Sequence, residues 1–160
     1  MAKDRTPVTP AILFMKKSGI KFTLRPYRYE EHGGTNVAAR ELGVEENMVI
    51  KTLVMEEDKG KPLIILMHGD RMVSTKSLAR VIGVKTVSPC DPHVAEKHTG
   101  YRVGGTSPFG TKRPLMIYME ESIAALPKIL INAGSRGLLA EMEPAELMRT
   151  LQPVSVKVAK

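Results

Sequence analysis

The chain has 160 residues, of which 42% are hydrophobic and 26% are charged, as is typical of one globular domain. Its net charge of +7 favours a polyanionic partner such as nucleic acid, with solubility alone as the other explanation. The single cysteine excludes an intrachain disulfide, and no apolar run approaches the roughly 18 residues of a transmembrane helix. The first residues lack the apolar stretch of a secretory signal, so we expect a cytoplasmic protein without a membrane partner.

The first part of the chain alternates short helices and strands. Thr9 and Pro10 predict the start of a helix that ends at Gly19. The other predicted elements up to residue 98 are strands over 20–29, 48–56, 63–68 and 85–87, a helix over 37–42 capped by Thr35 or Asn36, a helix over 76–82 capped by Ser74 or Thr75, and a helix over 92–98 capped by Asp91.

After a glycine-rich loop, the second part of the chain continues the alternation. The predicted elements are strands over 114–119, 128–132, 138–142 and 153–158 and helices over 121–126 and 144–151. Several strands are joined by turns too short for parallel crossovers. The sequence therefore predicts an α/β (α+β) fold over residues 1–160, a single domain with a mixed, mostly antiparallel, barrel-like sheet surrounded by helices.

Two loops are rich in glycine, TGYRVGGTSPFGTKRP at 99–114 and NAGSRG at 132–137. Glycine lets the backbone approach a ligand closely, and consecutive amides in such turns can bind an anion or an ester oxyanion. A tight turn without a ligand is the alternative for each loop. A nucleotide-binding phosphate loop is disfavoured, because GTSPFGTK at 105–112 inverts the required Lys-Ser/Thr order and Pro114 blocks the following helix.

Lys51 is a lone cation on one apolar face of a predicted strand, which also carries Val49, Leu53 and Met55. A buried ammonium has a depressed pKa, which suits acid–base work or the binding of an anionic group. The alternative is an edge-strand lysine whose ammonium reaches water.

Several common catalytic centres are missing from the sequence. It contains no GxSxG motif, and its four histidines show no metal spacing, so we expect them to be exposed or at helix ends. Cys90 has no evident histidine partner and is interpreted as a packing residue.

The segments VIKTLV, DPHVAEKHTGY, TGYRVGGTSPFG and NAGSRGL together resemble the YbaK-type aminoacyl-tRNA deacylases, relatives of the editing domain inserted in bacterial prolyl-tRNA synthetase. The resemblance covers almost the whole chain. It implies hydrolysis of a wrong amino acid, typically cysteine, from tRNA(Pro), without a metal or organic cofactor. It also implies aminoacyl-tRNA as the partner and leaves a complex with prolyl-tRNA synthetase open.

Site residues follow from the same resemblance. Lys51 matches the essential lysine of the family, and Gly104 and Gly105 supply main-chain amides for the oxyanion. The substrate-binding residues implied are Tyr27, Thr52, Ser107, Pro108, Asn132, Gly134, Ser135 and Arg136. Lys112, Arg113 and Arg136 are candidate tRNA-facing cations, with plain solvated charges as the alternative.

The absence of a nucleophile fits a substrate that supplies its own thiol, which would attack the ester carbonyl and form a cyclic thioester. The chain departs from the family at two pocket positions, with Leu139 in place of an aspartate and Asn132 in place of a serine. A pocket phenylalanine also lacks a clear counterpart, Val37 being the nearest. Four hypotheses stay open: a deacylase of Cys-tRNA(Pro), with Cys-tRNA(Cys) as an alternative substrate; a deacylase of another small aminoacyl-tRNA by water attack; a small-molecule hydrolase that uses the same pocket without tRNA; and a non-catalytic tRNA- or synthetase-binding module.

Overall fold

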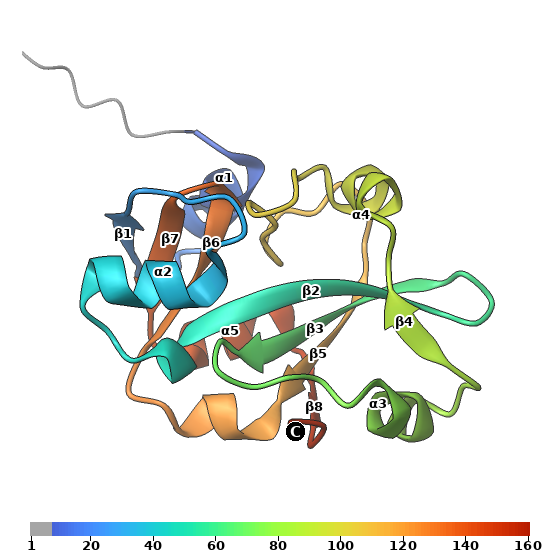
Figure 1. Ribbon diagram of the computed structural model, residues 1–160. Helices are drawn as coiled ribbons and strands as arrows, with labels where there is room; N and C mark the ends of the chain where they lie inside the picture. The colour runs from blue at the N-terminus through green and yellow to red at the C-terminus, as the bar shows by residue number, and fades with distance from the viewer. Residues whose placement is uncertain (1–7) are drawn as a thin grey trace, which may run out of the picture.

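The computed structural model describes residues 8–160, which form one α+β domain (Figure 1). The helices are α1 (Pro10–Lys17), α2 (Gly34–Leu42), α3 (Thr75–Ile82), α4 (Pro92–Thr99) and α5 (Pro144–Leu151), with 3-10 turns η1 (Glu46–Met48) and η2 (Glu121–Ala125). The strands are β1 (Thr23–Pro26), β2 (Val49–Glu57), β3 (Pro62–His68), β4 (Val87–Pro89), β5 (Met116–Glu120), β6 (Ile129–Ser135), β7 (Leu138–Met142) and β8 (Val154–Val156). No helix within residues 8–160 is long and apolar enough to span a bilayer.

Side-chain caps fix the starts of three helices. Thr9, Ser74 and Asp91 each accept a hydrogen bond from a main-chain amide in the first turn of α1, α3 and α4, as predicted. The predicted cap of α2 is wrong, because this helix begins at Gly34 and its cap residue is Gly33. Thr35 instead donates a hydrogen bond to the Glu46 carboxylate at 2.8 Å, which ties α2 to η1.

The eight strands form one sheet in the order β1-β7-β6-β2-β3-β5-β8, with β4 paired to β2. Neighbours are antiparallel in β1·β7, β6·β7, β2·β3 and β2·β4, and parallel in β2·β6, β3·β5 and β5·β8. The predicted mixed sheet with helices around it is therefore confirmed. The predicted strand over 85–87 begins two residues later, and the predicted helix over 121–126 is the 3-10 turn η2.

Strand β3 lies at the centre, and its residues from Leu63 to His68 are all buried. Its side chains alternate between two apolar clusters, with Ile64 and Leu66 in one and Ile65 and Met67 in the other. His68 belongs to this buried strand, so the prediction of exposed or helix-end histidines is wrong for it. Its ring nitrogens lie 2.8 Å from the Asn47 carbonyl oxygen and 2.7 Å from the Ser122 hydroxyl, which offsets the cost of burying the ring.

The sheet has a gap along one side of β2, the long strand that crosses the domain in Figure 1. On the side away from β3, β6 pairs with β2 only at Val49 and Ile50, and β4 pairs only at residues 55–57. Within the described part of the chain, residues 51–54 of β2 consequently have no strand neighbour on that side. This interruption positions the candidate site.

Candidate functional site

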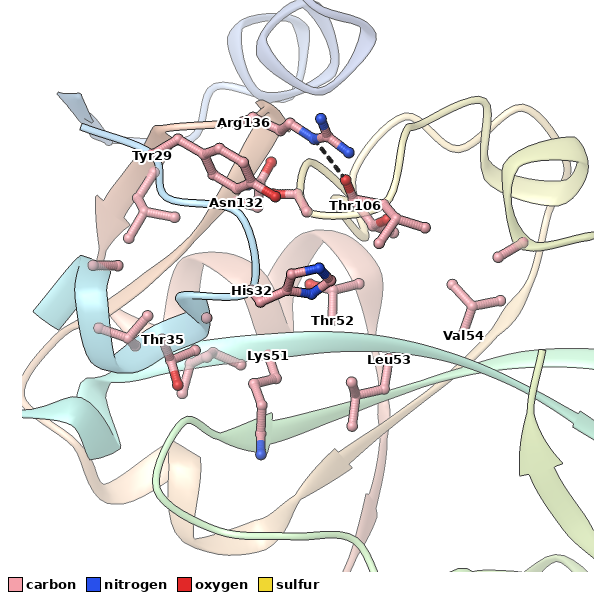
Figure 2. Close-up of a pocket in the computed structure, with 18 of the residues that line it drawn as sticks. Tyr29, His32, Thr35, Lys51, Thr52, Leu53, Val54, Thr106, Asn132 and Arg136 are labelled. Atoms are coloured by element: carbon pink, nitrogen blue, oxygen red, sulfur yellow. Dashed lines mark hydrogen bonds between the residues drawn. The ribbon is translucent and has the colours of Figure 1, made fainter. Parts of the chain in front are cut away.

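A cavity of about 500 Å³ opens at the gap along β2. Its walls come from residues 51–54 of β2, the 27–35 segment, the 103–106 loop and the ends of β6 and β7 (Figure 2). Of the predicted site residues, those that line the cavity are Tyr27, Lys51, Thr52, Gly104, Asn132 and Arg136. Segments far apart in the sequence thus meet around one hollow.

The other predicted site residues do not line the cavity and instead hold the loops in place. Ser107 is fully buried, and its hydroxyl accepts a hydrogen bond from the Phe109 amide at 3.2 Å. A Cβ atom on Gly134 would lie 2.9 Å from the Tyr101 ring, so this glycine allows a close packing contact. The remaining residues of this group are Gly105, Pro108 and Ser135.

The two amides predicted as oxyanion donors differ in availability. The Gly105 amide donates to the Arg102 carbonyl at 2.8 Å, so it closes a turn and is not free for a substrate. Within residues 8–160 the Gly104 amide donates no hydrogen bond. Gly104 has φ +88°, and a Cβ atom on it would lie 2.6 Å from the Tyr29 hydroxyl, so both conformation and space require glycine.

The second glycine loop is not an open anion site, because Asn132 fills it. The side-chain oxygen Oδ1 of Asn132 accepts hydrogen bonds from the main-chain amide of Gly134 at 2.7 Å and from that of Ser135 at 3.1 Å. The side-chain nitrogen Nδ2 of Asn132 donates to the main-chain carbonyl oxygens of Gly104 and Ser135, both at 3.2 Å. Of the two alternatives for this loop, the structure therefore favours the tight turn over an anion-binding nest, and Asn132 joins the two glycine loops.

Arg136 also holds the first glycine loop. Its Nε donates to the Val103 carbonyl at 2.8 Å, the contact drawn as a dashed line in Figure 2. The guanidinium carbon lies 5.2 Å from the centre of the Tyr29 ring, a cation–π distance. The Val103 carbonyl shares its peptide plane with the Gly104 amide, so Arg136 fixes the plane that carries this amide. Asn132 holds the Gly104 carbonyl, which belongs to the following peptide, and so fixes Gly104 from its other side.

Lys51 lies in the wall of the cavity, but its ammonium turns away from the cluster around Tyr29. Figure 2 shows its side chain on the opposite side of β2 from His32. The ammonium donates a hydrogen bond to the Arg71 carbonyl. Partial burial lowers the pKa of Lys51, as the strand pattern predicted, while the carboxylates of Glu46 and Asp70 oppose this shift.

Sequence reasoning missed several residues of the cavity, among them Tyr29, His32 and Thr106. Tyr29 had a usable signal, because it stands two positions after Tyr27 in an extended segment. His32 has φ +62°, an uncommon conformation for a residue other than glycine, which the sequence did not indicate. Cys90 also lines the cavity, and burial raises the pKa of its thiol to about 11, so the thiol stays protonated at neutral pH.

Of the positions at which the chain departs from the family pattern, one lines the cavity and another does not. Leu139 lines the cavity and is buried, whereas Val37 is buried in α2 and is not part of the cavity lining. Lys112 and Arg113 are exposed and lie outside the cavity lining. Residues 8–160 contain no group of three or more His, Cys, Asp or Glu side chains placed to hold a metal ion.

Comparison with known proteins gives one consistent result. The aminoacyl-tRNA editing domain family matches residues 31–150. An Enterococcus faecalis protein described as a candidate Cys-tRNA(Pro)/Cys-tRNA(Cys) deacylase, EbsC, is 29% identical over 150 residues, 92% of each chain. A proline–tRNA ligase of Thermoanaerobacter sp. (strain X514) is 29% identical over 95 residues, which are 58% of this chain and 16% of the ligase.

Solved structures agree on the fold. A crystal structure of a candidate trans-editing enzyme for prolyl-tRNA synthetase superposes with a TM-score of 0.85 at 20% identity, covering 97% of this chain and 99% of the other. The hypothetical protein APE2540 superposes with a TM-score of 0.87 at 22% identity, covering 95% and 100%.

Proposed function

The chain belongs to the aminoacyl-tRNA editing domain family and is an aminoacyl-tRNA deacylase, and we propose that it removes cysteine from mischarged Cys-tRNA(Pro), with Cys-tRNA(Cys) as a second substrate. The observation that carries the proposal is the free Gly104 amide at the wall of a cavity that also holds Lys51, Thr52 and Asn132. The name of the Enterococcus relative, a candidate Cys-tRNA(Pro)/Cys-tRNA(Cys) deacylase, supports the same substrates.

In the proposed reaction the cysteinyl thiol is the nucleophile. Its sulfur bonds to the ester carbonyl carbon, the bond from that carbon to the ribose oxygen breaks, and the thiol proton ends on the ribose oxygen. Water then opens the cyclic thioester to give free cysteine. Because the protein's own Cys90 thiol has a pKa of about 11, it is a poor competitor for this role.

The Gly104 amide stabilises the oxyanion that forms during the attack. Arg136 holds the peptide plane of this amide through the Val103 carbonyl, and Asn132 holds the following peptide through the Gly104 carbonyl. Gly104 is thus positioned before the substrate arrives, so no reorganisation is needed at the moment of reaction. Lys51 acts by position: its ammonium binds the Arg71 carbonyl and anchors β2 where the strand borders the cavity.

The net charge of +7 supports tRNA binding. We propose that Arg136, Lys112 and Arg113 contact the phosphates next to the acylated end, so affinity falls as salt rises. Prolyl-tRNA synthetase is the proposed source of tRNA selection, because part of the Thermoanaerobacter ligase is similar to this chain.

A second candidate substrate is a small apolar aminoacyl group cleaved by water. Leu139 favours it, because this apolar side chain lines the cavity at the position where the resemblance implies an aspartate. Such an enzyme would cleave Ala-tRNA(Pro) as well as the cysteinyl ester.

The proposal is tested by deacylation of Cys-tRNA(Pro), Ala-tRNA(Pro) and Cys-tRNA(Cys), with Lys51→Ala beside the wild type. We expect selective loss of cysteine and a fall of about 100-fold in the variant, because Lys51 positions β2 and a misplacement of about 1 Å costs about that factor in rate. Equal loss of alanine would establish the second candidate. An unchanged rate in Lys51→Ala would contradict the role of Lys51.

A further inference from the structure

Hydrogen bonds at one end of β2 show which main-chain groups face the gap in the sheet. The Glu57 amide donates to the Lys61 carbonyl at 3.0 Å, so the odd-numbered residues of β2 direct their main-chain groups toward β3. The Val54 carbonyl accepts from the Cys90 amide at 3.1 Å, on the opposite side. Because this direction alternates along a strand, the N–H and C=O of Thr52 also point away from β3.

Among residues 8–160, no strand lies opposite Thr52 on that side. The ladder with β6 ends at the Ile50–Ile131 pair, and the ladder with β4 begins at the Met55–Pro89 pair. Thr52 lies between these ladders and borders the cavity, so its N–H and C=O form an open strand edge one residue long.

The side chain of Thr52 gives an independent indication. Its Oγ1 atom is buried and has no hydrogen-bond partner among residues 8–160. A buried hydroxyl without a partner costs free energy, and it calls for a ligand or a water. Three polar groups of one residue are thus unpaired at the cavity wall: the N–H, the C=O and Oγ1.

We propose that Thr52 binds the aminoacyl group as if that group were one residue of a neighbouring antiparallel strand. The α-ammonium donates to the Thr52 carbonyl, and the ester carbonyl accepts from the Thr52 amide, which is the hydrogen-bonded pair of an antiparallel ladder. The inference rests on the proposed function, since it takes the ligand to be an aminoacyl ester. It adds a second main-chain donor, besides the Gly104 amide, for the ester oxygen.

The pairing also determines where the amino-acid side chain goes. Residues directly opposite each other in an antiparallel pair place their side chains on the same face. The side chain of an L-amino acid therefore lies beside Thr52 Oγ1, which becomes a hydrogen-bond partner for a cysteine thiol. A D-amino acid, or an acyl group without the ammonium, cannot satisfy all three groups.

The test uses L-cysteine joined by an amide to 3′-amino-3′-deoxyadenosine, a probe whose linkage resists cleavage. Hydrogen exchange of the Thr52 amide is followed by NMR with and without saturating probe. We expect exchange to slow at least about tenfold, because a new hydrogen bond protects the amide. Matched D-cysteinyl and 3-mercaptopropionyl probes should bind at least about tenfold more weakly. Unchanged exchange at saturation, equal affinity of the three probes, or no binding of the L-cysteinyl probe overturns the inference.

Thr52→Val separates the main chain from the hydroxyl at nearly constant shape. The variant keeps the open edge, so protection of residue 52 persists, while the preference for the cysteinyl over an alanyl probe falls about three- to tenfold. Loss of protection in Thr52→Val would contradict a main-chain interaction.

Turnover distinguishes this inference from the proposed function. If the wild type leaves Cys-tRNA(Pro) intact but the probe protects the Thr52 amide from exchange, the proposed reaction is refuted and aminoacyl binding at the open strand edge of Thr52 is supported. If Cys-tRNA(Pro) and 3-mercaptopropionyl-tRNA(Pro) are cleaved with equal kcat/KM, the proposed reaction is supported and recognition of the α-ammonium by the open strand edge of Thr52 is refuted.

Discussion

Asn132→Asp isolates the hydrogen bond that joins the two glycine loops. The aspartate keeps an oxygen to accept from the Gly134 and Ser135 amides but loses both donors, and its charge faces the carbonyl oxygens of Gly104 and Ser135. Each lost neutral hydrogen bond contributes about 0.5–1.5 kcal/mol. We therefore expect a loss of about 1–3 kcal/mol and a melting temperature lower by about 2–12 °C for a chain of this size.

The effect of Asn132→Asp on catalysis should exceed its effect on stability. Removing an oxyanion donor costs about 10²–10³ in kcat, and the variant displaces the Gly104 amide without deleting it, so we expect a fall of about 10- to 100-fold. The assay is single-turnover deacylation of Cys-tRNA(Pro), performed well below the melting temperature of the variant.

Asn132→Ala is the matched comparison, because it also leaves the Gly134 and Ser135 amides without their acceptor. It should lower the melting temperature further than Asn132→Asp, with a comparable fall in rate. A wild-type rate in Asn132→Asp would refute the conclusion that the Asn132 side chain, through its hydrogen bond to the Gly104 carbonyl, helps to position Gly104 for catalysis.

Three other predictions concern the same region and its support. Gly104→Ala should abolish most activity and lower the thermal stability, since its Cβ atom would lie 2.6 Å from the Tyr29 hydroxyl. Adding Tyr29→Phe removes that hydroxyl and should restore part of the thermal stability; no restoration would contradict the contact. The Cys90 thiol, with a pKa of about 11 against an ordinary 9.0, should react with iodoacetamide at pH 8 about 100-fold more slowly than free cysteine, and equal rates would disprove the shift. Burial raises the pKa of Tyr101 to about 12, so the contribution of its neutral hydroxyl to stability is complete below pH 10 and is lost between about pH 10 and 12. In chemical denaturation, Tyr101→Phe should flatten the decline of the unfolding free energy over this pH range, and an equally steep decline would contradict the raised pKa.

Local signals predicted much of the secondary structure. Thr9, Ser74 and Asp91 were identified as caps because a cap depends only on the next few residues. The strand pattern around Lys51 likewise predicted its half-buried position and lowered pKa. The α2 cap failed because Thr35 binds Glu46, a contact eleven residues away that no local rule includes.

The site itself was predicted only in part, because it depends on how distant loops meet. Asn132 was assigned to the substrate, yet its side chain satisfies the loop that follows it and reaches Gly104, 28 residues earlier. The gap beside Thr52 was not foreseeable, since it results from where β6 and β4 stop pairing with β2. Sequence patterns identified Thr52 as a site residue but could not identify its main chain as the open part.

The most direct test of the central claim compares Cys-tRNA(Pro) with Ser-tRNA(Pro), because serine and cysteine differ by the one atom that the proposed mechanism uses. The measurement is the single-turnover rate constant at saturating protein. We predict that the cysteinyl ester is cleaved at least about 100-fold faster, since the hydroxyl is far less nucleophilic than the thiol. Equal rate constants would contradict substrate-thiol assistance and would indicate that water attacks the ester.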